Sequence, residues 1–222
     1  GWLKDGSVLI CDGKILEVTN SDLAVIGATV IDARGMTIVP GFVSMHAHGG
    51  GGHDYTEATE EAFRTATNAH LKHGATGIFP TLSSTSFERL YQAVDVCEHL
   101  MKEKDSPILG LHIEGPYLNP KMAGTQYDGF LKTPDENEYI PKYTRSKGIM
   151  TAVTHTEAEY DEIKAAFAVG FSHAAHFYNA MPGFHKRREY KYEGTVESVY
   201  LTDGMTVEVI ADGIHLPATI LK

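Results

Sequence analysis

The sequence has the length and composition of an ordinary globular protein. It contains 222 residues, of which 42% are hydrophobic and 22% charged, enough for a sizeable core. A formal net charge of −10 excludes a typical nucleic-acid-binding protein, because a phosphate backbone needs a basic surface. No stretch resembles a membrane span or a signal peptide, so we expect no membrane partner. Cys11 and Cys97 are the only cysteines and lie far apart, which favours a reducing, cytoplasmic location.

Residues 1–40 have the pattern of short strands joined by turns. Residues 7–10, 14–18 and 29–32 are rich in residues that favour strands, and Asp12-Gly13 is a hairpin signal. We therefore predict a small all-β unit over the first 40 residues.

From residue 41 onwards, predicted strands alternate with predicted helices. The strands are expected in the apolar run that ends at His46-Ala47-His48 and over residues 76–82, 108–116, 148–155, 171–176 and 205–215. The helices are expected over residues 57–73, 87–104 and 157–168, the second with an apolar face of Leu90, Val94, Cys97 and Met101. This alternation is the signature of βα units that build a parallel sheet or a barrel.

Two histidines spaced two apart end the apolar run that starts at Pro40. Alternate residues of a strand point to the same side, so His46 and His48 can present both imidazoles to one metal ion. The alternative is that they are simply polar residues where a strand meets a loop. The rest of the chain must decide between these interpretations.

Further candidate ligands end other predicted strands. Glu114 ends an apolar strand just before Gly115-Pro116, where parallel α/β folds and barrels place their chemistry. A buried glutamate is costly unless it is paired or bound to a metal. His155 and His176 end two later strands in the same way.

Two other histidines are expected to lie outside this set. His112 shares a strand face with Glu114 but lies a layer deeper, which favours a packed or supporting role. His173 and His176 differ by an odd number of positions, so strand alternation predicts that they face opposite ways.

A barrel brings the C-terminal ends of its strands to one face, so ligands distant in sequence converge there. Mixed imidazole and carboxylate ligation suits Zn²⁺ and also admits Fe²⁺, Mn²⁺ or Co²⁺. We therefore predict a divalent-metal site, with zinc preferred, built from His46, His48, Glu114, His155 and His176.

Five motifs, PGFVSMHAHG, LHIEGPYLNP, THTEA, HFYNAMPG and IADGIH, follow one another along nearly the whole chain. In this order they resemble the N-acetylglucosamine-6-phosphate deacetylase family of the amidohydrolase superfamily. The resemblance implies that residues 1–40 are part of a β-sandwich and that residues 41–222 belong to a distorted TIM-like (β/α)8 barrel. It makes Glu114, His155 and His176 the principal metal ligands. His46 and His48 match a pair that some members use for a second metal, so one or two ions are expected.

The resemblance also implies hydrolysis of the acetamide of N-acetylglucosamine-6-phosphate to glucosamine-6-phosphate and acetate. His215, in the DGxH motif, would donate a hydrogen bond to the developing oxyanion, although without the motif it reads as a surface histidine. The phosphate would be contacted by the backbone at Asn179-Ala180 and by either Arg187 or Arg188. The resemblance implies a homodimer in which this arginine binds the phosphate held by the neighbouring subunit. Taken alone, the charge run 185–189 is more typical of a solvated face. Gln126 stands where many relatives have a histidine that contacts the sugar, and an amide can also bond a hydroxyl.

The chain departs from the family pattern at two places. Relatives carry a general-base aspartate in a V-T-D type motif, and this sequence stops at Lys222 before any such strand. About one βα unit is also missing near residues 141–142, which leaves six of the eight barrel strands. Because such a barrel would expose unpaired edges, we expect that the sequence omits residues at both places.

Three alternatives are weighed against this function. Within enzymes, the substrate could be N-acetylgalactosamine-6-phosphate or another amide. From a different class, the chain could be a catalytically inactive protein that binds a metal or a sugar phosphate. A purely structural protein would require the His and Glu positions to be accidental.

Overall fold

The computed structural model describes residues 1–135 and 148–222. These residues form two compact units, residues 1–40 and residues 41–222. The interruption expected near residues 141–142 lies outside the described residues. In the described part of the chain, every helix is too short or too polar to span a bilayer.

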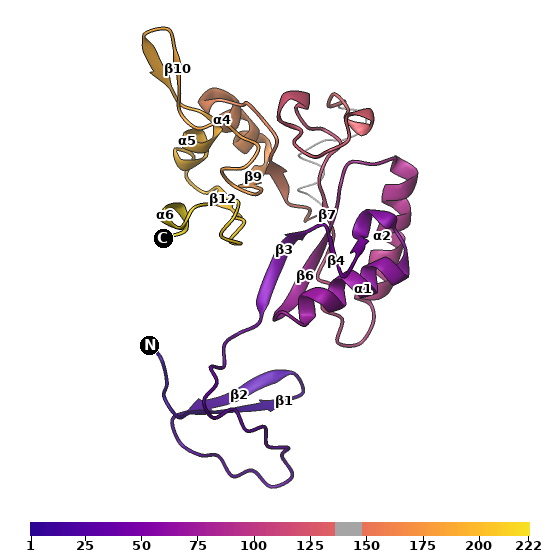
Figure 1. Ribbon diagram of the computed structural model, residues 1–222, viewed down its shortest axis with the longest axis vertical. Coiled ribbons are helices and arrows are strands. Elements are labelled where there is room, and N and C mark those ends of the chain that lie inside the picture. Colours follow the sequence, from indigo (N-terminus) through magenta and orange to yellow (C-terminus); the bar gives the residue numbers. More distant parts are fainter. Residues whose placement is uncertain (136–147) are drawn as a thin grey trace. The chain divides into compact units, whose positions relative to one another are not determined.

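The first unit contains one antiparallel hairpin, drawn in indigo in Figure 1. Strands β1 (Ser7–Cys11) and β2 (Lys14–Thr19) pair across Asp12 and Gly13. Both turn residues have positive φ, 49° and 73°, as a two-residue type I′ hairpin requires. The Asp12-Gly13 hairpin prediction is confirmed.

The strand predicted over residues 29–32 is wrong, because these residues have no strand structure. Val30 and Ile31 are 84% and 85% exposed, so no neighbouring strand within this unit covers them. A sandwich needs a second sheet, and the β-sandwich expected around residues 1–40 stays a prediction.

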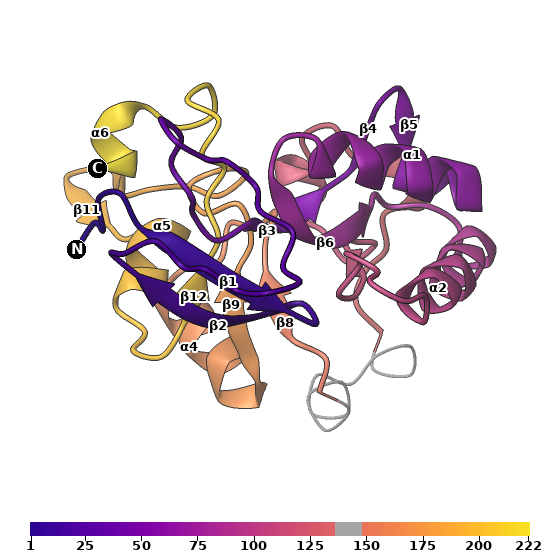
Figure 2. The same cartoon turned by 90° about the horizontal axis from the view of Figure 1, so that it is seen from below.

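The second unit contains two three-stranded parallel sheets (Figures 1 and 2). The first has the order β3-β6-β7 and consists of β3 (Phe42–Ala47), β6 (Ala75–Leu82) and β7 (His112–Ile113). The second has the order β12-β9-β8 and consists of β8 (Thr151–Val153), β9 (Phe171–Ala174) and β12 (Thr206–Val207). All six strands predicted in this region are therefore present. Between the described residues of the two sheets, no strand pairing is seen.

Several of these strands are shorter than predicted. The strand expected over residues 108–116 shrinks to β7 and one isolated bridge from Ile78 to Ile108. Gly110 and Gly115 flank β7, and glycine weakens a strand because it has no side chain to pack. The strand expected over residues 205–215 is limited to β12.

Helices follow the strands as the alternating pattern predicts. In the described residues, α1 (Glu60–Leu71), α2 (Phe87–Met101) and α4 (Tyr160–Val169) correspond to the three predicted helices. The short helices α5 (Thr195–Tyr200) and α6 (Ala218–Leu221) were not predicted. Three short 3₁₀ helices cover Tyr55–Glu57, Pro120–Met122 and Asp128–Phe130. Side-chain caps begin the first two α-helices: Thr59 accepts from the Ala62 N–H, and Ser86 from the Arg89 N–H.

Two small antiparallel hairpins complete the second unit. They are β4 (Gly49–Gly50) with β5 (His53–Asp54), and β10 (His185–Arg187) with β11 (Tyr190–Tyr192). Figure 1 shows the second of these extending from the part of the chain that carries α4 and α5.

The second unit has a hydrophobic cluster beside each sheet. One includes residues of α1, α2 and β6, and the other includes residues of α4, α5 and β9. Cys97 belongs to the first cluster and is 2% exposed, which confirms its predicted place in the core.

The apolar face predicted for α2 is only half correct. Leu90 and Cys97 are buried, but Val94 and Met101 are 38% and 41% exposed. Ala93 and Leu100 are buried in their place. Positions 90, 93, 97 and 100 lie on one stripe of a helix with 3.6 residues per turn. Val94 and Met101 therefore lie at the edge of the buried face.

Candidate metal centre

The candidate ligands lie at the C-terminal ends of parallel strands. His46 lies in β3, His48 follows it directly, and Glu114 follows β7. His155 and His176 each lie two residues beyond the end of a strand, β8 and β9. The strand-end rule that predicted these positions therefore holds for all five.

The pairing of β8 with β9 sets the two later histidines side by side. Val153 pairs with Ala174 in the parallel register, and His155 and His176 stand two residues beyond these partners. Both histidines have positive φ, 44° and 34°, a backbone conformation that costs roughly 1–2 kcal/mol for a residue with a Cβ. Such conformations cluster at functional sites, where the surrounding structure holds them in place.

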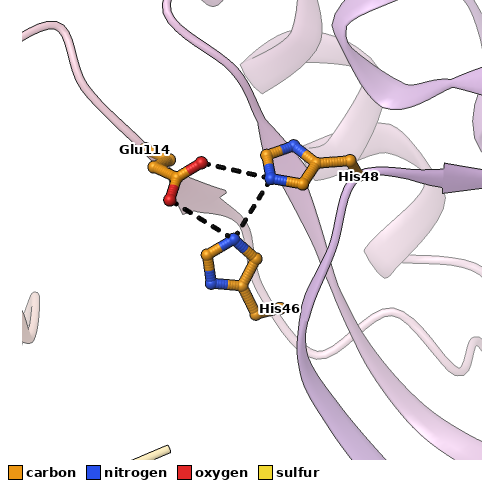
Figure 3. A group of neighbouring side chains, drawn as sticks. All are labelled: His46, His48 and Glu114. Carbon is orange, nitrogen blue, oxygen red and sulfur yellow. Dashed lines mark hydrogen bonds and ion pairs between the residues drawn. The ribbon is translucent and has the colours of Figure 1, made fainter. Parts of the chain in front are cut away.

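Glu114 is the point on which the four histidines converge. Its Oε1 lies 2.9 Å from His176 Nε2 and 3.0 Å from His155 Nε2. Its Oε2 lies 3.1 Å from His48 Nε2, and its Oε1 is 3.6 Å from His46 Nε2. Figure 3 shows the rings of His46 and His48 pointing at this carboxylate. Glu114 is 3% exposed, so the cluster surrounds a buried charge.

The far nitrogens of the later pair are held by backbone carbonyls. His155 Nδ1 lies 2.6 Å from the Met122 oxygen, and His176 Nδ1 lies 3.1 Å from the Asn179 oxygen. A carbonyl oxygen only accepts, so both Nδ1 atoms must donate. The Nε2 atoms are then left to face Glu114, which is the arrangement found in histidines that bind metals.

The spacing of the donor atoms fits a metal ion. The Nε2 atoms of His46 and His48 are 3.2 Å apart, and those of His155 and His176 are also 3.2 Å apart. Donors about 2.0–2.2 Å from a tetrahedral ion lie roughly 3.3 Å from one another. The groups His46-His48-Glu114 and Glu114-His155-His176 could each hold an ion. They share Glu114.

The electrostatics of the cluster favour positive charge. Burial lowers the pKa of His46, but its contacts with the carboxylates of Glu114 and Glu208 outweigh burial and raise that pKa to about 9. Burial raises the pKa of Glu114, but hydrogen bonds from the surrounding histidines, His155 first, bring it well below its usual range. Lone pairs of neighbouring Nε2 atoms repel each other and the carboxylate unless a proton or a metal ion lies among them. The donor set therefore suits a divalent cation.

Glu208 was not among the predicted site residues, yet it contacts the cluster. It follows β12 directly, and its Oε1 lies 2.7 Å from His46 Nδ1. His173 Nε2 lies 3.5 Å from Glu208 Oε2. His173 is in none of the groups of described residues that could hold an ion, although it lies against a residue that supports the cluster. That it faces away from the metal site stays a prediction.

His112 has the supporting position that was expected. Its Nδ1 donates to the Met45 oxygen at 3.1 Å, and its ring centroid lies 4.3 Å from that of His46. Burial, followed by repulsion from His46, lowers the pKa of His112. It therefore packs as a neutral ring against His46.

Gln126 is engaged with the protein rather than open to a sugar. It is buried, its Nε2 donates to Glu114 Oε2 at 2.6 Å, and its Oε1 accepts the Ser84 N–H at 2.8 Å. Both ends of the amide thus have protein partners. The predicted contact with substrate stays a prediction, while the structure gives Gln126 the role of holding Glu114.

His215 stands apart from the cluster. It is exposed, and its Nδ1 donates to Asp212 Oδ2 at 2.7 Å. Asp212 Oδ1 also accepts the backbone N–H groups of Ile214 and His215. These hydrogen bonds, the one from the His215 backbone first, lower the pKa of Asp212 to about 2. Among the described residues, no hydrogen bond joins His215 to Glu114 or its four histidines.

The predicted phosphate contacts lie on two segments. Asn179 and Ala180 follow His176 in a strained loop, where Ala180 has a φ of 52°. Arg187 forms an ion pair with Glu159 and lies 5.1 Å from the centre of the Tyr192 ring. Arg188 is exposed and has a φ of 55° in the turn between β10 and β11.

Two relatives match nearly the whole of this chain. A protein from Lysinibacillus sphaericus and one from Bacillus subtilis, both named N-acetylglucosamine-6-phosphate deacetylase, are 28% and 29% identical over 97% and 96% of it. The chain spans about three fifths of the length of these relatives, 59% and 61%.

Solved structures agree with the relatives. The N-acetylglucosamine-6-phosphate deacetylase of Pasteurella multocida matches 96% of the chain with a TM-score of 0.86 and 25% identity, and 62% of that protein is covered. A mutant of the Mycobacterium smegmatis enzyme, solved in complex with N-acetyl-D-glucosamine-6-phosphate, matches 97% with a TM-score of 0.81 and 28% identity, with 61% of it covered. Residues 41–222 therefore have an amidohydrolase fold of mixed α and β structure, which is consistent with the predicted TIM-like barrel. A model of the amidohydrolase family matches residues 37–222, and this chain belongs to that family.

Proposed function

We propose that this protein hydrolyses the acetamide of N-acetylglucosamine-6-phosphate, which yields glucosamine-6-phosphate and acetate. The convergence of four imidazole Nε2 atoms on the buried Glu114 carboxylate carries the proposal. The names of the relatives and of the solved structures supply the substrate.

The metal assignment follows from the two groups of donors. Glu114, His155 and His176 would hold one ion, and His46 and His48 would hold a second with Glu114 between them. Zinc suits this donor set best, and Fe²⁺, Mn²⁺ and Co²⁺ share its ligand preferences. When bound, a divalent cation lowers the pKa of water and polarises an amide carbonyl.

The remaining residues would position the substrate. His215, oriented by Asp212, would donate to the carbonyl oxygen as charge develops on it. The backbone N–H groups of Asn179 and Ala180 would contact the phosphate. Arg187 would have to exchange Glu159 for phosphate, whereas Arg188 is exposed and forms no ion pair with any of the described residues.

Three wider expectations stay proposals. Assembly as a homodimer would bring an arginine of β10 or its turn to the phosphate of the neighbouring subunit. The cytoplasmic location rests on cysteine usage, and the β-sandwich around residues 1–40 rests on the resemblance.

Metal content and acetate release, measured on the same preparation, test the proposal. We expect bound divalent metal by elemental analysis and acetate release from N-acetylglucosamine-6-phosphate. Glu114→Gln and His176→Asn should lower both, because each removes a donor from the cluster. His73→Gln, an exposed histidine, is the matched control and should retain metal and activity.

Each outcome separates the alternatives. Metal without acetate release would reject the deacetylase and favour the protein that only binds. Unchanged metal content in both cluster variants would show that the ligands are assigned wrongly.

A second candidate substrate has one observation in its favour. A relative from Shewanella, 24% identical over 81% of the chain, is named N-acetylgalactosamine-6-phosphate deacetylase. The ratio of kcat/KM for the two epimers decides between them, and we expect the glucosamine epimer to be preferred.

A further inference from the structure

Glu208 joins two members of the cluster that come from different sheets. Its Oε1 lies 2.7 Å from Nδ1 of His46, in β3, and accepts the backbone N–H of His176 at 3.1 Å, beyond β9. Its side chain is 11% exposed. We propose that Glu208 is a positioning residue, which fixes the His46 imidazole with Nδ1 as donor and Nε2 turned to the metal site. This inference rests on the metal centre proposed above.

The distance shows that the contact is a hydrogen bond rather than shared ligation. His46, His112 and Glu208 are close enough to be considered as a metal-binding group. However, 2.7 Å between His46 Nδ1 and Glu208 Oε1 is short for two donors around a tetrahedral ion, which lie roughly 3.3 Å apart. It is a normal length for a charge-assisted hydrogen bond.

Hydrogen bonds on both sides of the Glu208 backbone fix the position from which its side chain extends. The Glu208 N–H donates to the Ala174 oxygen at 3.1 Å, and the Glu208 oxygen accepts the Phe177 N–H at 2.7 Å. Among the described residues Oε2 has no hydrogen-bond partner, and His173 Nε2 lies 3.5 Å from it. The oxygen that faces the cluster, Oε1, is therefore the one that makes the hydrogen bonds.

His46 and His48 are consequently not equivalent ligands. The outer nitrogen of His46 donates to a carboxylate, whereas His48 Nδ1 lies 3.1 Å from the neutral Ser83 hydroxyl. A carboxylate behind the ring increases the basicity of the opposite nitrogen and fixes the ring orientation. Glu208 should therefore increase the affinity of His46 and His48 for the ion that they would hold.

Zinc affinity in the Glu208→Gln variant tests this role. The substitution keeps the shape of the side chain and removes its charge, and we expect zinc affinity in competition with a chromophoric chelator to fall about 10–100-fold. Glu98→Gln, which removes an exposed carboxylate paired with Lys102 on α2, should leave it unchanged. A lower melting temperature of the chelator-treated variant with unchanged zinc affinity would show a structural role alone and overturn the proposal.

The position of the ring hydrogen of His46 can be measured in the unaltered protein, so this second test does not depend on the Glu208→Gln variant. In zinc-loaded protein, ¹⁵N spectra of the imidazole rings should show His46 with its hydrogen on Nδ1, the signal being assigned with His46→Gln. A hydrogen on Nε2 instead would overturn the proposal.

The readouts also separate this inference from the proposed activity. Protein that binds zinc but releases no acetate would reject only the deacetylase, and the affinity and ring spectra would still decide the role of Glu208. Protein that binds none of the divalent metals Zn²⁺, Fe²⁺, Mn²⁺ and Co²⁺ would reject both.

Discussion

Gln126 connects the central carboxylate of the candidate metal centre to the backbone of a neighbouring loop. In Gln126→Leu, the buried N–H of Ser84 loses its acceptor, and Glu114 Oε2 loses a donor. An unsatisfied buried polar group costs about 1–3 kcal/mol, and we expect the free energy of unfolding in urea to fall by that amount. Gln92→Leu, at an exposed position of α2, is the control. Equal effects of the two substitutions would contradict the role assigned to Gln126.

At the level of single residues, sequence reasoning identified the side chains that converge at the candidate metal centre, but it missed the supporting contacts of Glu208 and Gln126. Glu114 was identified because it is a carboxylate at the end of an apolar strand. The same argument could have identified Glu208, which lies between Val207 and Val209. That signal was present but not used. The bonds of Gln126 had no signal, because they depend on a loop that folds back onto Glu114.

The helices that cover the second sheet depend on a few buried aliphatic side chains. Ile163 of α4 is fully buried, whereas Val169 at the end of the same helix is 53% exposed. Ile163→Ala should lower the free energy of unfolding by about 2–5 kcal/mol, because it leaves a cavity. Val169→Ala should change it by at most about 0.5 kcal/mol. Urea unfolding measures both, and a small loss for Ile163→Ala would place α4 outside the cooperative core.

The helices α1 and α2 were predictable because the signals that start them are local. Thr59 and Ser86 cap α1 and α2 through bonds within the helix, so the sequence around each start contains the signal. A strand instead needs a partner elsewhere in the chain. Residues 29–32 have the composition of a strand but no partner within their unit, and this is why that prediction failed.

At the scale of the whole molecule, the candidate centre draws its donors from two sheets. Glu114 follows a strand of the first sheet, whereas His155 and His176 lie just beyond strands of the second. An ion that binds only the folded protein stabilises it by about 2.7 kcal/mol at a concentration 100 times its Kd. We therefore expect the melting temperature to rise with zinc and to fall with a chelator. His73→Gln should show the same shift and Glu114→Gln a much smaller one; equal shifts in both would contradict the assignment.

The arrangement of whole sheets was beyond the reach of local patterns. Alternating strands and helices predicted parallel βα units correctly, and the family motifs predicted a TIM-barrel-like fold. The separation of the described strands into β3-β6-β7 and β12-β9-β8 depends on pairings between distant segments. Neither periodicity nor turn signals carry that information.

The hydrogen bonds behind the histidine rings have an entropic consequence. The rings of His155 and His176 are fixed by the Met122 and Asn179 carbonyls, so folding itself removes their rotational freedom. Ordering a side chain at the moment of binding costs about 0.5–1.5 kcal/mol. An ion that binds here would find these donors already ordered. Its binding free energy would therefore not be reduced by the cost of ordering them.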